Sequence, residues 1–87
     1  MWVQQRDYKV VGAILAEARE KSGLSQDQLA ERLSKPQSFV SHYENGQRRI
    51  DLLEFIRIME GLGGDPAEVF KLVLRRQLSG KSRPVKR

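Results

Sequence analysis

A pair of short amphipathic segments, separated by the dipeptide Lys35-Pro36, constrains the fold of this chain more than any other feature. Ser25 followed by Gln28 is a capping-box pattern that starts the first segment. The residue before a proline avoids the α region and a proline suits the first turn of a helix, so one segment ends here and the next begins. Gly46 closes the second segment. Two helices this short, joined by a few residues, cannot pack antiparallel and must cross steeply.

Three further helices are predicted around this pair. One runs from the N-cap candidate Asp7 to Gly23, another begins after Asp51, and the last opens at Pro66. The helix after Asp51 has more apolar positions than one narrow stripe needs, so we expect it to lie centrally. No segment alternates like a strand, which predicts an all-α fold of five short helices. The expected core comprises the apolar positions of the three helices that surround the pair, beginning near Asp7, Asp51 and Pro66: Val10, Val11, Ile14, Leu15, Ala18, Leu52, Leu53, Phe55, Ile56, Ile58, Met59, Leu62, Val69, Phe70, Val73, Leu74 and Leu78.

The length of 87 residues is enough for one domain. We expect an N-terminal arm (1–6), a folded domain (7–78) and a basic flexible tail (79–87). With no cysteine and one histidine, the chain excludes a disulfide, a cysteine nucleophile and a thiolate or histidine-cluster metal site. The sequence has no membrane-span or signal-peptide pattern, so a cytoplasmic location is expected. It also lacks a carboxylate pair, a nucleophile–base set and a phosphate-cradling loop, so we expect neither an enzyme nor a cofactor.

The net charge of +5 is concentrated at one end of the chain. Seven of the 16 basic residues and none of the 11 acidic residues lie from Lys71 onward, so the rest of the chain carries nine basic and eleven acidic residues. Nucleic-acid binding by the body must therefore rest on a local group of side chains rather than on the total charge.

Such a group lies on the outer surface of the second helix of the pair. Val40 and Tyr43 are spaced to face inward, which leaves short polar side chains outside: Gln37, Ser38, Ser41, His42 and Asn45. A helix that presents neutral donors and acceptors can enter the major groove, where glutamine reads adenine bidentately. The basic loop Gln47-Arg48-Arg49 follows directly and suits contacts with phosphate.

The segments Gly23–Leu33 and Gln37–Gly46 together resemble the Cro and phage-repressor-type helix-turn-helix domain, also called the XRE family. The resemblance runs from about Ile14 to Leu62 and implies a lambda-repressor-like fold, with the helix-turn-helix at about 25–45 and the recognition helix at 36–45. It implies a sequence-specific transcriptional regulator, a repressor, that binds double-stranded DNA. One departure is Ser34, where the family often has glycine. The implied base-reading residues are Gln37, Ser38, Ser41 and His42, and the implied phosphate-binding residues are Gln26, Asn45, Arg48 and Arg49.

The resemblance also implies an ion pair between Arg19 and Glu44 beneath the recognition helix, and binding as a dimer. The last helix has more apolar surface than one flank of a small domain needs, so we expect a homodimer interface at Phe70, Val73 and Leu74. A two-fold dimer would require a palindromic operator. The alternative, from a different class of function, is an antitoxin-like or accessory module that binds a protein partner, which the slightly acidic body favours.

Overall fold

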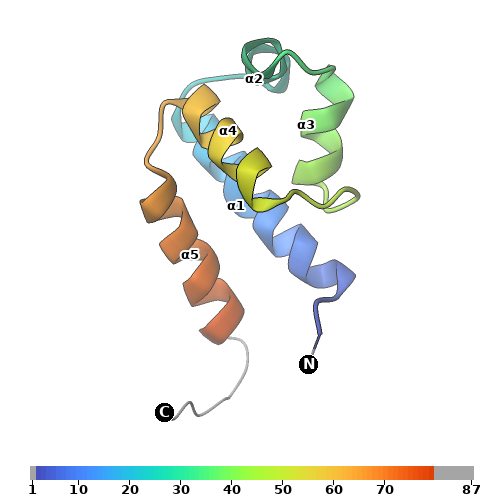
Figure 1. Ribbon diagram of the computed structural model, residues 1–87, viewed down its shortest axis with the longest axis vertical. Coiled ribbons are helices and arrows are strands. Elements are labelled where there is room, and N and C mark those ends of the chain that lie inside the picture. Colours follow the sequence, from blue (N-terminus) through green and yellow to red (C-terminus); the bar gives the residue numbers. More distant parts are fainter. Residues whose placement is uncertain (1, 80–87) are drawn as a thin grey trace.

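The computed structural model describes residues 2–79, with side chains described for residues 2–77. The predicted tail beyond residue 79 lies outside the described residues. Five helices follow one another in the described range: α1 (Gln5–Lys21), α2 (Gln26–Leu33), α3 (Gln37–Glu44), α4 (Leu52–Leu62) and α5 (Pro66–Ser79). Figure 1 shows α2 almost end-on and α3 along its length, so the two helices cross steeply. The predicted all-α, five-helix fold is confirmed.

Side-chain hydrogen bonds cap the N-terminal ends of α2 and α4. The hydroxyl of Ser25 accepts from the backbone N–H of Gln28, whose side chain accepts in turn from the N–H of Ser25 at 2.8 Å. Asp51 and Glu54 form the same reciprocal box at the start of α4. At the end of α2, Ser34 takes the left-handed conformation with φ of 58°, so the turn keeps its left-handed position with serine in the place of the usual glycine.

The predicted start of α1 at Asp7 is wrong. The helix begins at Gln5, and Gln4 is its N-cap. The backbone N–H of Gln4 donates to the Asp7 carboxylate at 2.8 Å, so Asp7 is the third residue of the helix, at the N3 position of a capping box, rather than the cap itself. Residues 5 and 6, expected in the N-terminal arm, are therefore helical. An acidic residue is favourable both at the N-cap and in the first turn of a helix, so the pattern alone did not separate the two positions.

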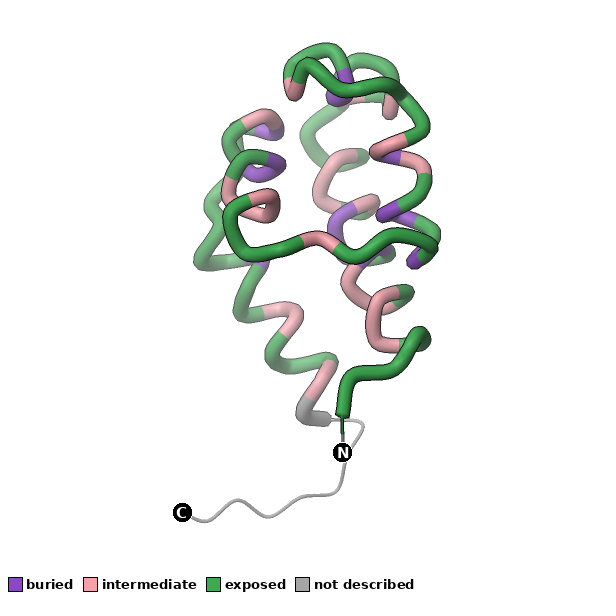
Figure 2. The backbone as a smooth tube through the Cα atoms, turned by 45° about the vertical axis from the view of Figure 1, so that its right-hand side comes forward, coloured by how far each residue is buried: buried purple, intermediate pink, exposed green. Residues whose placement is uncertain are grey.

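The core forms where the inner faces of the helices meet, as the buried positions in Figure 2 show. Its most completely buried side chains are Ile14, Leu15, Leu29, Val40, Ile58 and Met59. The expectation that α4 lies centrally is wrong, because only one stripe of it is buried. Leu52 and Leu53, in its first turn, are 67% and 68% exposed. The stripe follows the i, i+3, i+4, i+7 spacing of Phe55, Ile58, Met59 and Leu62, which leaves the first two leucines on other faces.

Helix α5 divides its apolar residues between the core and solvent. Val69 is buried, and Leu72 and Val73 pack against the core while partly exposed. Phe70 and Leu74, which were also expected in the core, are exposed.

No helix within residues 2–79 is long and apolar enough to cross a membrane.

Candidate nucleic-acid interface

Helix α3 presents the polar face that the sequence predicts. Val40 and Tyr43 point into the core, and Gln37, Ser38, His42 and Asn45 are exposed, with Ser41 partly exposed. Gly12 of α1 determines how closely α3 is held, because a Cβ atom there would collide with the carbonyl oxygens of Tyr43 and Glu44. The backbones of the two helices therefore meet directly. Sequence reasoning missed Gly12, which lies within a helical pattern without any local signal.

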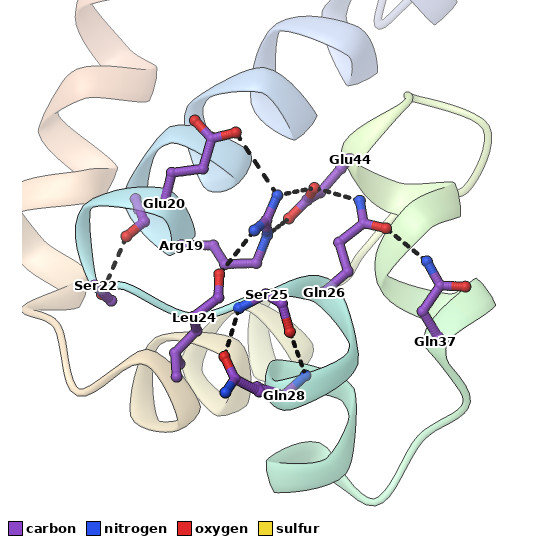
Figure 3. A network of polar contacts seen from close by, with 10 residues as sticks. Arg19, Glu20, Ser22, Leu24, Ser25, Gln26, Gln28, Gln37 and Glu44 are labelled. Carbon is purple, nitrogen blue, oxygen red and sulfur yellow. Dashed lines mark hydrogen bonds and ion pairs between the residues drawn. The ribbon is translucent and has the colours of Figure 1, made fainter.

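A series of polar contacts connects α1, α2 and α3 beneath this face (Figure 3). Arg19 Nε donates to Glu44 Oε2 at 2.8 Å and its Nη2 donates to Oε1 at 3.1 Å, so the predicted ion pair is present. The two side chains are only 11% and 4% exposed. Donation of these hydrogen bonds to Glu44 raises the pKa of Arg19 above its usual value, which keeps the guanidinium charged.

The same carboxylate fixes two glutamine side chains. Gln26 Nε2 donates to Glu44 Oε1 at 2.8 Å, and Gln37 Nε2 donates to Gln26 Oε1 at 2.6 Å. Because one N–H of the Gln37 amide is used in this way, its second N–H and its carbonyl oxygen remain for a partner outside the protein. The amide of Gln37 therefore offers one donor and one acceptor side by side on the exposed face of α3.

The loop after α3 positions two arginines differently. Arg48 forms a bidentate pair with Glu54, with Nη2 to Oε2 at 3.0 Å and Nη1 to Oε1 at 3.2 Å, and its guanidinium lies over the ring of Phe39 at 4.7 Å. This hydrogen bonding raises the pKa of Arg48 and lowers the pKa of Glu54. Arg49 lies over the ring of Tyr8 at 5.1 Å, and no carboxylate in the described part of the chain pairs with it.

The start of α1 holds this loop in place. Gln5 Nε2 donates to the carbonyl oxygen of Gly46 at 3.1 Å. Gly46 has φ of +78°, and a Cβ atom there would collide with Lys9. Glycine is thus required at this position both by its backbone conformation and by the close approach of α1. The loop that carries both arginines is fixed relative to α3.

Comparison with known proteins identifies this arrangement. The sequence profile of the HTH_3 helix-turn-helix family matches residues 15–69. An XRE-family-like protein from Pseudomonas syringae pv. tomato is 39% identical, and the match covers 82% of this chain and 87% of that one with a TM-score of 0.73. This chain belongs to the XRE-type helix-turn-helix family. It is therefore a DNA-binding transcriptional regulator and not an enzyme.

Two further solved structures are similar to this XRE-type protein. The restriction-modification controller protein C.AhdI from Aeromonas hydrophila is 33% identical, with a TM-score of 0.70 over 76% of this chain and 96% of that one. The clp gene regulator ClgR from C. glutamicum has the same fold at 21% identity, with a TM-score of 0.73 over 86% and 95% of the two chains. The comparison with curated proteins gives no match.

The expected site residues of this XRE-type protein lie on α3 and on the segments that adjoin its two ends. The side chains expected to read bases share the outer face of α3, and Gln26 lies beside Gln37 near the start of that helix. Asn45, Arg48 and Arg49 follow its C-terminal end. Like Gly12, Glu54 was not singled out from the sequence, because its local pattern indicates only the cap of α4.

Proposed function

We propose that this XRE-type protein is a repressor that binds a palindromic operator as a homodimer, with α3 in the major groove. The base-reading residues are Gln37, Ser38, Ser41 and His42, and the phosphate-binding residues are Gln26, Asn45, Arg48 and Arg49. The observation that carries this proposal is the hydrogen bond from Gln37 to Gln26, which leaves an oriented donor and acceptor on the exposed face of α3. An adenine edge offers the complementary acceptor and donor in the major groove.

Phosphate contacts on both sides of α3 would fix its register on the duplex. The dimer interface is the apolar strip of α5 at Phe70, Val73 and Leu74, of which the first and last are exposed. A two-fold axis along this strip would set two recognition helices about 34 Å apart, which corresponds to half-sites ~10 base pairs apart. A regulatory role agrees with C.AhdI, which is named as a controller protein.

The test begins with selection of bound duplexes from a random pool, which yields the operator and its half-site spacing. Gln37→Ala should then weaken binding to that operator by about 1–3 kcal/mol and relax the preference at one base position. Ser22→Ala is the control, because Ser22 is an exposed neutral residue at the C-terminal end of α1, outside α3 and its loop, and its hydroxyl donates to the carbonyl oxygen of Ala18 in its own helix. Equal losses for Gln37→Ala on the operator and on a scrambled duplex would reject the base-reading role.

A second candidate function is an accessory module that binds a protein partner. The observation that favours it is an open cleft of about 620 Å³ between α2 and α4, lined in part by Leu33, Phe39 and the exposed Leu53. Exposed apolar side chains beside a cleft are typical of protein-binding surfaces. Measurement of duplex DNA binding separates the two candidates. A repressor binds duplex DNA with an affinity that falls as salt rises, whereas a protein-binding module does not require DNA binding.

A further inference from the structure

Arg48 and Arg49 are adjacent in sequence and differ in how their charge is compensated. Both oxygens of Glu54 accept from the guanidinium of Arg48, at 3.0 and 3.2 Å. Arg49 has no such partner within residues 2–77. Of the two loop arginines expected to bind phosphate, one is therefore already occupied by a carboxylate of the protein itself.

The pair of Arg48 and Glu54 is accessible enough for another anion to replace Glu54. The side chains are 41% and 30% exposed, so the pair is solvated and screened rather than enclosed. Two contacts besides Glu54 also hold the guanidinium: it stacks on Phe39, a residue of α3, and its Nη1 donates to the carbonyl oxygen of Arg49 at 2.7 Å. A carboxylate and a phosphate both accept bidentate hydrogen bonds from the same guanidinium edge, so they compete for it.

We infer that Glu54 competes with DNA phosphate for Arg48, because its carboxylate occupies the guanidinium edge that a phosphate would otherwise bind. Glu54 thereby limits the affinity for DNA and the salt dependence of binding. This inference rests on the proposed function, in which the outer face of α3 contacts DNA. When Arg48 turns to a phosphate, the Glu54 carboxylate is left uncompensated beside a polyanion, which offsets much of the gain. A neutral side chain in its place removes this penalty.

The decisive variant is Glu54→Gln. A glutamine side chain also suits the capping box, since its oxygen can accept from the N–H of Asp51 as the carboxylate does now at 2.9 Å. Binding is measured over a range of salt on the selected operator and on a scrambled duplex. We expect about two- to fivefold tighter binding on both duplexes, the range for release of a solvated ion pair. The plot of log K against log salt should steepen by up to ~0.9.

Glu60→Gln is the matched control. Glu60 lies on the same helix, is exposed, and pairs with Arg57 at 3.2 Å, so this variant makes the same change in net charge away from the loop. It should leave the salt slope unchanged. A second control combines Glu54→Gln with Arg48→Gln, and in that background the gain should disappear.

Three results would overturn the inference. The first is that Glu54→Gln behaves like Glu60→Gln, and the second is that its gain persists without Arg48. The third is that Glu54→Gln and Arg48→Gln weaken DNA binding to the same extent with an unchanged salt slope. The pair would then only stabilise the conformation of the loop. If the parent protein retains neither duplex at any salt, the proposed function itself fails, and that outcome is distinct from the other three.

Discussion

Replacement of Arg19 by methionine should be among the most destabilising single changes in this domain. Among the described residues, it removes two of the three hydrogen bonds donated to the Glu44 carboxylate and leaves the bond from Gln26. It also removes the bond from Arg19 Nη1 to the carbonyl oxygen of Leu24. The Glu44 side chain is 4% exposed, so solvent cannot replace the lost partner. Stranding one member of a buried pair costs about 3–5 kcal/mol, and the 11% exposure of Arg19 places the expected loss near the lower end, at about 3 kcal/mol.

The assay is urea and thermal unfolding followed by far-ultraviolet circular dichroism. Trp2 is a poor fluorescence probe here, because it lies exposed before α1. A loss of 3 kcal/mol corresponds to a fall in Tm on the order of 15 °C for a domain of this size. The matched control is Arg57→Met, which breaks an exposed pair with Glu60 and should cost less than about 1 kcal/mol.

The double variant Arg19→Met with Glu44→Met should recover most of the loss, since two packed apolar side chains replace the pair without leaving a buried charge. The reasoning is refuted if Arg19→Met costs no more than Arg57→Met. It is also refuted if the double variant is less stable than Arg19→Met alone, since the cost would then not come from an unpaired carboxylate.

Three further changes test other parts of the structure. Gly12→Ala places a methyl group against the carbonyl oxygens of Tyr43 and Glu44. It should lower the free energy of unfolding, measured in urea, by about 1–3 kcal/mol. An unchanged urea midpoint would contradict the close approach of α1 and α3. Tyr43→Phe removes a buried hydroxyl that has no hydrogen-bond partner among the described residues, and should raise the free energy of unfolding by about 1 kcal/mol at neutral pH. Because burial raises the pKa of Tyr43, the parent should also lose stability as pH rises above ~10, a loss that the phenylalanine variant lacks, and a less stable variant at neutral pH would count against this. Phe70→Glu should sediment as a monomer and keep its helical circular dichroism, with a Tm that no longer rises with protein concentration, beside a dimeric parent and a dimeric Lys71→Glu control. A parent that stays monomeric at high concentration would rule out the dimer.

Features that depend on neighbours in sequence could be predicted from the sequence. The capping boxes at Ser25 and Asp51 use side chains three residues apart, and Gly23 ends α1 with φ of +79°. Each of these signals acts within one helical turn, so the linear pattern contains all the information needed. The pair of Arg19 and Glu44, which lie 25 positions apart, was expected only from the resemblance to a known family.

Features that depend on the approach of two elements could not be predicted. Gly12 matters only because α1 crosses the end of α3, and Glu54 pairs with Arg48 only because the loop brings Arg48 beside the first turn of α4. Hydropathy places Leu52 and Leu53 in the core, but the direction of the buried stripe of α4 depends on where α2 and α5 lie. A pattern within one helix does not determine which neighbouring helices that helix packs against.

The direction of each hydrogen bond in the series beneath α3 follows from one charge. An ionised carboxylate only accepts, so Gln26 must turn its N–H toward Glu44 and its oxygen toward Gln37. Gln37 must then donate to that oxygen, which determines which edge of its own amide remains outside. Arg19 supplies the opposite charge beside this carboxylate, in a place where solvent hardly reaches. The orientation of an exposed amide on α3 is thus set two hydrogen bonds away, by the same ion pair that holds α1 against α3.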